Sequence, residues 1–312
     1  MKNLMMGAVL CASLAACGDG NPFTGAGTST GGGDDTDVNA AGIPAVLAQD
    51  LESFTYNPDN QTLTIRGVTA EDSPFEASYV RKPALDRGGY QAYTQQDGSL
   101  DRHSTAFVKD IDGTRAGIAA TGGQFTFFFV GGAYGNSSYS APVDPGSNLQ
   151  GGLVQYAGNY VGVVNTAGSG EDLLPVAPGT ETSFLPGQVA EITGRILVTA
   201  SFSDSSVAGT ITERVIEDAE ANGFAPLAVP DIQLAPTDIA LDGTFLGEVK
   251  QVGEEKGTYG GIFGGTGATE VAGVLTVEDH DLGGVADIEN GVFVLGACGT
   301  AAQDPVCNQP VP

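Results

Sequence analysis

The sequence predicts an all-β protein of two domains. Short runs of alternating polar and apolar residues recur from about Leu51 to Leu295, which is typical of strands with one buried face. Glycine supplies 47 of the 312 residues, and many glycines stand inside apolar-rich segments. Such glycines are typical of tight turns and close backbone approaches. Because helical periodicity is scarce, these observations favour a β-sandwich or a β-barrel architecture.

The first segment is predicted to be a lipoprotein signal peptide. Lys2 precedes a short apolar run that ends in two alanines before Cys17. The run is too short to cross the ~30 Å hydrocarbon core of a bilayer. A cysteine directly after small residues resembles the lipobox of bacterial lipoproteins, in which the peptide is cut before the cysteine. We therefore expect residues 1–16 to be removed and Cys17 to carry lipid such as palmitate, with an ordinary signal peptide as the alternative.

The N-terminal part of the mature chain is predicted to be a tether followed by a small domain. Residues 17–47 are rich in Gly, Ser, Thr and Asp and lack an apolar period, which indicates a flexible tether. Residues 48–142 are predicted to form a β-sandwich-like domain, which contains an alternating run at Thr62–Arg66. The run Gln124–Val130, QFTFFFV, is predicted to be a buried strand, with an aromatic ligand platform as the alternative.

The second domain, residues 150–312, begins after a Pro- and Gly-rich turn. Alternate residues from Tyr156 to Val164 are expected to share one strand face. The segments Ile196–Phe202 and Val207–Ile211 are expected to form a hairpin. Glu213–Asn222 is expected to form a short helix that ends before Gly223. Further strands are expected at Ile239–Val249, Gly257–Phe263, Val271–Val277 and Gly291–Leu295.

The charge of the chain excludes some partners. The formal net charge is −26, so the phosphate backbone of a nucleic acid would repel the chain. Charge would not hold it on anionic lipid either, so acyl chains must anchor it. Seven of the twelve basic residues lie between Arg66 and Arg115. Among them, Arg81, Lys82 and Arg87 are interpreted either as solvated loop charges or as a contact surface for an acidic partner.

The residue types that carry chemistry do not form a catalytic pattern. His103 and His280 stand far from any nucleophile-elbow motif, and both are interpreted as loop histidines. Cys298 and Cys307 are nine positions apart and are expected to form a disulfide in an oxidising compartment. We therefore expect no enzymatic activity, no resident cofactor and no metal site.

One acidic segment leaves calcium binding open. Asp279 and Asp281 belong to a short acidic run, and Asp287 follows it closely. Oxygen-rich loops of this kind suit calcium. A turn between acidic strands is the alternative interpretation.

The sequence Gly257–Leu275, GTYGGIFGGTGATEVAGVL, carries the most specific signature. It resembles the C-terminal barrel hairpin of the transferrin-binding protein B-like surface lipoproteins. That family's pattern is an aromatic-glycine strand, a G-P-x-A-x-E turn and an apolar strand with paired glycines. Gly265 replaces the proline, the turn is one residue longer and Ala272 replaces one of the later glycines. The matching residues are Tyr259, Phe263, Gly264, Ala268, Glu270 and Gly273.

The resemblance implies a fold and a class of function. It covers about residues 155–298, and it implies an antiparallel eight-stranded barrel next to a handle domain. It also implies a lipid-anchored outer-membrane protein that captures or presents a protein, haem or a metal carrier, alongside an outer-membrane receptor. A structural envelope lipoprotein that faces the periplasm without a soluble ligand is the alternative. Glu270 is interpreted as a carboxylate that stabilises the turn.

Overall fold

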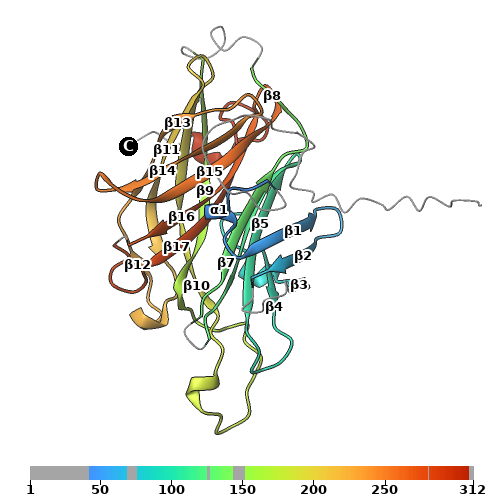
Figure 1. Cartoon of the computed structure of the whole chain (residues 1–312), viewed down its shortest axis with the longest axis vertical. Coiled ribbons are helices and arrows are strands. Elements are labelled where there is room, and N and C mark those ends of the chain that lie inside the picture. The colour runs from blue at the N-terminus through green and yellow to red at the C-terminus, as the bar shows by residue number, and fades with distance from the viewer. Residues whose placement is uncertain (1–41, 69–75, 125–126, 143–151, 280, 309–312) are drawn as a thin grey trace, which may run out of the picture.

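The computed structural model describes residues 42–68, 76–124, 127–142, 152–279 and 281–308, and it is nearly all β-structure (Figure 1). The predicted signal peptide, Cys17, most of the predicted tether and the predicted boundary between the domains lie outside these residues. His280 also lies outside them.

The N-terminal part is one seven-stranded antiparallel sheet, here called the handle sheet, in the order β1-β2-β3-β4-β5-β6-β7. Its two edges approach each other, because the Asp50 amide donates to the Val130 carbonyl at 3.0 Å. The Val130 amide in turn donates to Asp50 Oδ2 at 3.0 Å. The strands are β1 Leu51–Asn57, β2 Thr62–Gly67, β3 Glu76–Arg81, β4 Gln91–Gln95, β5 Ser104–Ile111, β6 Thr114–Thr121 and β7 Val130–Gly135.

The C-terminal part is a closed antiparallel barrel of eight strands. The order β10-β9-β17-β16-β15-β14-β13-β11 closes where β11 pairs with β10. Full closure leaves these strands no free edge. The predicted eight-stranded barrel is therefore confirmed. Its strands are β9 Leu153–Ala167, β10 Val189–Ser201, β11 Ser206–Ile216, β13 Ile232–Asp238, β14 Thr244–Gln251, β15 Glu254–Thr266, β16 Glu270–Glu278 and β17 Ile288–Gly296.

Short elements complete the fold. β8 pairs in parallel with the end of β15, and β12 adds two residues to the edge of β11. These elements are α1 Ala45–Ala48, β8 Tyr139–Ser140, β12 Leu227–Ala228, η1 Pro83–Leu85, η2 Thr182–Phe184, η3 Glu220–Asn222 and η4 Pro305–Asn308.

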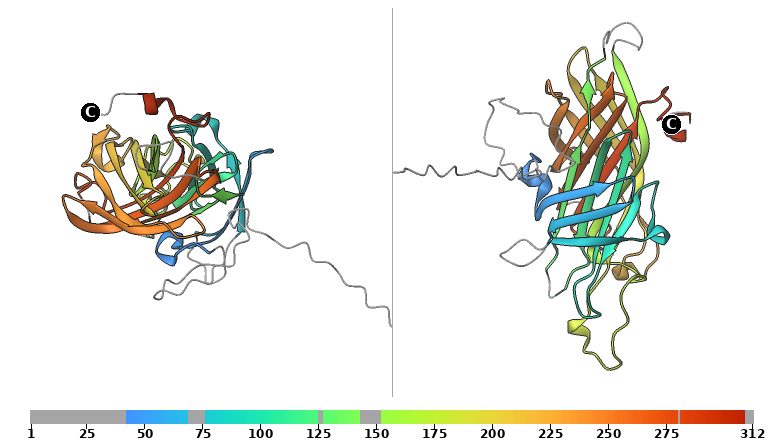
Figure 2. Two further views of the ribbon diagram at one scale, coloured as in Figure 1. Left: turned by 90° about the horizontal axis from the view of Figure 1, so that it is seen from above. Right: turned by 90° about the vertical axis from the view of Figure 1, so that its right-hand side faces the viewer.

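The handle sheet packs against the outside of the barrel, so one wall of the barrel serves both cores (Figure 2). Outward-facing Val161, Val274 and Val292 of the barrel belong to the same buried cluster as Phe54 and Phe107 of the handle. The second layer of the predicted sandwich-like domain is therefore the barrel wall itself. The inward-facing barrel residues form a separate cluster.

The barrel interior is filled by side chains. Tyr156, Tyr160, Tyr259, Phe263 and Phe293 are each at most 1% exposed. The predicted face of β9 is confirmed, since Tyr156, Tyr160 and Val164 point into this core. A barrel of about eight strands has an interior just wide enough for such filling.

Four sequence-based expectations differ from the structure. The tether was predicted to reach residue 47, but Ile43 and Leu47 are buried against the handle and barrel because α1 covers that seam. The predicted helix at Glu213–Asn222 is mostly strand β11 and a loop, and only Glu220–Asn222 forms a helical turn. The predicted strand Ile239–Val249 includes a turn at Asp242–Gly243, so β14 begins at Thr244.

The fourth difference concerns the aromatic run. Gln124–Val130 is not a buried strand, because β7 begins only at Val130 and Phe127 is 55% exposed. Gln124 and Phe127 close a tight turn through two backbone hydrogen bonds. Residues 125 and 126 of this run lie outside the part that the structure describes.

Candidate binding surface

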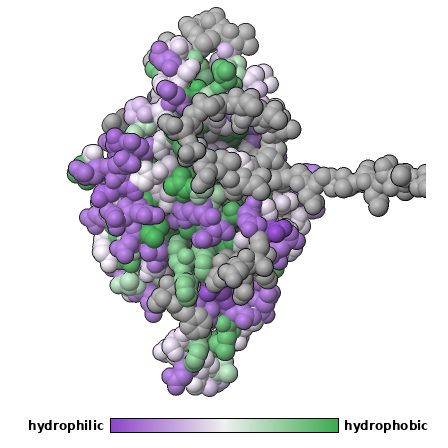
Figure 3. All heavy atoms as spheres, in the orientation of Figure 1, coloured by the Kyte–Doolittle hydropathy of each residue, from purple (hydrophilic) through white to green (hydrophobic). Residues whose placement is uncertain are grey.

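Three loops at one end of the molecule, the lower end in Figure 1, carry exposed apolar side chains. Figure 3 shows hydrophobic residues among hydrophilic ones at this end. The exposed side chains come from the loops β4–β5, β6–β7 and β9–β10, two of the handle and one of the barrel. We call this group the tip surface; each member is between 37% and 55% exposed. Its members are Leu100, Phe127, Leu174, Val176, Phe184 and Leu185. Several large apolar side chains exposed on neighbouring loops are a candidate interaction surface.

Gln124 connects the three loops of the tip surface. Its side-chain amide donates to the carbonyl of Leu100 at 2.9 Å and to the carbonyl of Phe184 at 3.0 Å. Gln124 is 9% exposed, so these bonds are largely shielded from water. A further bond runs from the Leu174 amide to Gln96 Oε1 at 2.8 Å. The loops are therefore tied to each other rather than projecting separately.

Two glycines allow the handle and barrel loops to touch backbone to backbone. The Gly187 amide donates to the Gly123 carbonyl at 3.1 Å. A Cβ atom at Gly122 would overlap the Gly187 carbonyl, and one at Gly187 would meet the Gly122 carbonyl. This close approach therefore requires residues without a side chain.

Asp172, in the β9–β10 loop, fastens this loop to the handle sheet. Its carboxylate accepts hydrogen bonds from Lys82 Nζ at 2.7 Å and from Thr94 Oγ1 at 2.6 Å. The carboxylate also lies 3.1 Å from His103 Nε2. Burial raises the pKa of Asp172, but the bonds from Lys82, Thr94 and His103 outweigh burial and hold the pKa below its usual value. The barrel loop is thus fixed by three handle side chains.

His103 lies in the β4–β5 loop, as interpreted, but its side chain is fully buried. Burial lowers its pKa, and the neighbouring Asp172 only partly opposes that effect. The ring therefore packs as a neutral group between the handle sheet and the β9–β10 loop. Sequence reasoning missed this because the partner stands 69 positions away.

The three basic residues proposed as partner contacts are each held in an ion pair. Arg81 Nη1 lies 2.6 Å from Asp86 Oδ1. Lys82 pairs with Asp172 as described, and Arg87 Nε lies 2.6 Å from Glu191 Oε2 on β10. Two of these pairs join the handle to the barrel, so the basic group helps to hold the two parts together.

Tyr90 adds to this junction between handle and barrel. The fully buried Tyr90 hydroxyl donates to the Asn159 carbonyl of β9 at 3.2 Å. The Tyr90 hydroxyl also accepts a hydrogen bond from the Val294 amide of β17 at 2.8 Å. The turn that carries Arg87 is thus anchored to three barrel strands.

Glu191 is nearly fully buried at this junction. Burial raises the pKa of Glu191 to about 7; Asp218 and Glu217 add to the rise, and Arg87 opposes it. The folded chain therefore binds this proton more tightly than the unfolded chain, in which the usual value is 4.5.

Glu191→Gln is expected to match the wild-type free energy of unfolding near pH 4 and to exceed it at pH 8. The wild type loses stability as pH rises from about 4.5 to about 7, because the unfolded chain releases this proton first. Glutamine does not titrate. The variant's free energy of unfolding should therefore exceed the wild-type value by roughly 1–3 kcal/mol at pH 8, at ~1.4 kcal/mol per pKa unit. Urea unfolding at both pH values measures it. Exposed Glu248 provides the control Glu248→Gln, and a wild type more stable than Glu191→Gln at pH 8 would contradict the raised pKa.

The residues of the Gly257–Leu275 motif lie in the barrel core and at the seam with the handle. Tyr259 OH donates to the Ala235 carbonyl at 2.5 Å, and the Phe263 ring packs against Tyr156, Phe202 and Phe245. The positions Gly264 and Gly273 have no room for a Cβ atom, which would overlap Thr114 and Phe293.

The turn of this motif is held by hydrogen bonds. Ala268 adopts φ 54° and is fully buried, and its carbonyl accepts the Tyr156 hydroxyl at 2.5 Å. Glu270 is 4% exposed and bonds with Thr269 and with Thr114 of the handle. Burial raises its pKa, and these two hydrogen bonds oppose the rise. The contacts of this carboxylate join the β15–β16 turn to the handle.

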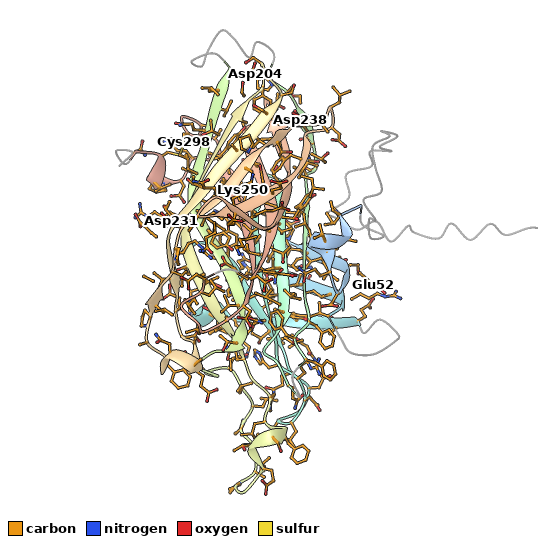
Figure 4. The ribbon with its side chains drawn as sticks, turned by 60° about the vertical axis from the view of Figure 1, so that its left-hand side comes forward. Glu52, Asp204, Asp231, Asp238, Lys250 and Cys298 are labelled. Atoms are coloured by element: carbon orange, nitrogen blue, oxygen red, sulfur yellow. A yellow bond between two sulfur atoms is a disulfide. The ribbon has the colours of Figure 1, made fainter. Side chains whose placement is uncertain are left out.

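Cys298 and Cys307 are joined by a disulfide, on the side of the barrel that is seen in Figure 4. The Cys298 amide donates to the Gln155 carbonyl of β9 at 2.8 Å, which places the start of the closed loop on the barrel. The C-terminal turn η4 is thereby held beside β9.

The acidic segment considered for calcium is organised by turn hydrogen bonds. Asp281 Oδ1 accepts the Gly283 amide at 3.0 Å, and the Asp287 amide donates to Asn165 Oδ1 at 2.9 Å. Asp279 adopts φ 50° at the end of β16. Among the residues that the structure describes, no three His, Cys, Asp or Glu side chains converge as metal ligands.

Comparison with known proteins gives one kind of match. No family model and no curated protein matches the sequence. The chain is similar to transferrin-binding protein B structures. This is the family that the Gly257–Leu275 motif indicated.

Three of these solved structures illustrate the extent of the match. The isotype 1 protein from serogroup B Neisseria meningitidis is 13% identical with a TM-score of 0.34, over 79% of this chain and 52% of that one. Intact Ap-TbpB, with N and C lobes, is 12% identical with a TM-score of 0.33, over 80% of this chain and 55% of that one. A double mutant of transferrin-binding protein B from Haemophilus parasuis Hp5 is 13% identical with a TM-score of 0.35. The match covers 84% of this chain and 56% of that one. The chain therefore spans about half the length of these structures.

Among the described residues, no helix is both long and apolar enough to cross a membrane.

Proposed function

We propose that this chain is a non-enzymatic lipoprotein, anchored in the outer membrane through Cys17, that binds a protein partner with its tip surface. The observation that supports the proposal is the tip surface itself: six large apolar side chains stay exposed on loops that are tied together. An exposed apolar group costs solubility unless it is covered in use. A purely structural envelope lipoprotein would give no reason to fasten such side chains in one place.

The arrangement of the loops suits recognition rather than catalysis. Gln124 and Asp172 fix the loops before any partner arrives, so little conformational entropy is lost on binding. The polar and charged groups at the base of the tip surface contact each other. Lys82 and the neutral His103 ring contact Asp172, and Arg87 contacts Glu191. They therefore serve to hold the loops, and the apolar side chains remain for the partner.

Anchoring is tested by Cys17→Ser, which is expected to move the protein from the membrane fraction to the soluble fraction. The variant lacks the sulfur that would accept the acyl chains, and no charge attraction to anionic lipid replaces them. Fractionation after labelling with a palmitate analogue measures both location and lipid. The matched control is the double variant Cys298→Ser/Cys307→Ser, which should keep the label. An unlabelled wild type, or a Cys17→Ser variant that stays labelled, would refute the anchor.

Binding is tested with the full chain carrying Cys17→Ser, immobilised and exposed to envelope extract and spent medium. A partner is expected to be retained saturably, to be lost by the variant Leu174→Asp/Phe184→Asp, and to be kept by Leu241→Asp. Leu241 is fully exposed but lies in the β13–β14 turn, three residues after Asp238, which Figure 4 labels at the upper end. If no partner depends on the two tip residues, the proposed function is wrong.

A further inference from the structure

We infer that the tip surface fits a protein partner whose own apolar patch is bordered by lysine or arginine. This inference rests on the proposed function, since it names the chemistry of the partner for the same surface. It is carried by the charges that surround the exposed apolar side chains.

Four exposed carboxylates lie on the loops of the tip surface. They are Asp97, Asp101, Glu171 and Glu181. Asp101 directly follows Leu100, and Glu181 stands three residues before Phe184. No ion pair within the described residues involves any of the four. These loops therefore present negative charge that is available to a partner.

Positive charge on the same loops is nearly absent. Between residues 96–103, 122–129 and 168–188 the sequence has one basic residue with a permanent charge, Arg102. Its guanidinium lies over the Phe129 ring, 4.8 Å from the centroid, where burial lowers its pKa. Lys82, which reaches the β9–β10 loop from the handle, is already paired with Asp172.

These charges select among the possible partners. Anionic lipid and nucleic acid would be repelled, and so would a second copy of a chain with a net charge of −26. An apolar patch bordered by basic residues matches both parts of the tip surface. Complementary charges of this kind mainly raise the association rate and exclude wrong partners. Binding should therefore weaken as salt increases.

The absence of tryptophan from the chain allows a clean test. In the full chain, Phe184→Trp places a single reporter at the tip surface. Leu241→Trp places the matched reporter in the β13–β14 turn, close to Asp238 and Asp242. Both variants are first checked for wild-type circular dichroism and melting, so that a folding defect is recognised. Because the whole chain is acidic, the second reporter detects any unspecific attraction of a basic probe.

Three peptides of equal length are titrated into each variant: alternating Leu and Lys, alternating Leu and Glu, and alternating Ser and Lys. Only the Leu/Lys peptide is expected to shift the Phe184→Trp emission to shorter wavelength, and Leu241→Trp should not respond. Adding Asp101→Lys/Glu181→Lys should weaken this binding roughly three- to tenfold, as expected for losing two exposed charge contacts.

Several results would overturn the inference. They are an equal response to the Leu/Glu peptide, no response to the Leu/Lys peptide, or the same response at Leu241→Trp. An equal shift with phosphatidylcholine or phosphatidylglycerol vesicles would identify a lipid-binding surface instead. Because these probes do not involve the natural partner, this inference can fail while the tip-dependent retention of a partner still holds, and the two failures are distinguishable.

Discussion

Glu289→Gln is expected to lower the free energy of unfolding by about 3–5 kcal/mol, because it leaves a buried guanidinium without its counter-charge. Arg214 on β11 and Glu289 on β17 form an ion pair inside the barrel, and both side chains are fully buried. Tyr160 on β9 donates its hydroxyl to Glu289 Oε1 at 2.6 Å, and Arg214 also donates to the Pro230 carbonyl. Urea unfolding followed by circular dichroism measures the loss.

A double variant separates the lost charge balance from lost packing. Arg214→Met/Glu289→Leu removes both charges together and should recover most of the stability, since buried ion pairs can often be replaced by apolar side chains at little cost. Tyr160→Phe removes only one hydrogen bond and should cost less than Glu289→Gln. If the free energy of unfolding of Glu289→Gln lies within about 1 kcal/mol of the wild-type value, Arg214 and Glu289 do not form a buried ion pair.

Asp172→Ala is expected to cost roughly 2–4 kcal/mol, because two buried groups of the handle lose their partner together. Thr94 is 3% exposed and His103 is fully buried, so water does not readily replace the missing carboxylate. Lys82 is 36% exposed and can be solvated again. Hydrogen exchange of residues 168–188 should become faster, because the β9–β10 loop loses its attachment to the handle.

The neighbouring residue provides the control for this variant. Glu171 is exposed, so Glu171→Ala should leave both stability and exchange unchanged. The pKa of Asp172 is lowered, so its contribution is present above its usual value of 3.8 and is lost as pH falls further. The stability difference between wild type and Asp172→Ala should therefore narrow below about pH 4. A difference that widens in acid would contradict the assigned contacts.

The sequence predicted the barrel strands well because inward and outward residues alternate strictly along most of them. The prediction failed at β11, where Val207 and Ile211 point inward but so does Arg214. A β-bulge lies between Ile211 and Arg214. Glu213 adopts φ 50° there, and the pairing of β11 with β10 shifts register between Thr193 and Arg195. One extra residue reverses which face the following side chains occupy, and nothing in the local sequence shows it.

The tip surface was missed for a different reason. The run Gln124–Val130 has the composition of a core strand, and only the bond network of Gln124 shows that it turns at the end of the sheet. The basic group Arg81, Lys82 and Arg87 was interpreted either as solvated loop charges or as a contact surface for an acidic partner. Its partners Asp172 and Glu191 come from the barrel, 90 and 104 positions further along the chain. Local sequence does not show pairing over such distances.

The most direct test of the proposed function is site-specific photo-cross-linking in cells that make the lipidated chain. A photoreactive phenylalanine analogue replaces Phe184 in one strain and Leu241 in another; both positions are exposed. We expect a discrete adduct with a different protein from position 184 and none from position 241. No adduct from position 184, or the same adducts from both positions, would contradict the assignment of the tip surface as the binding face.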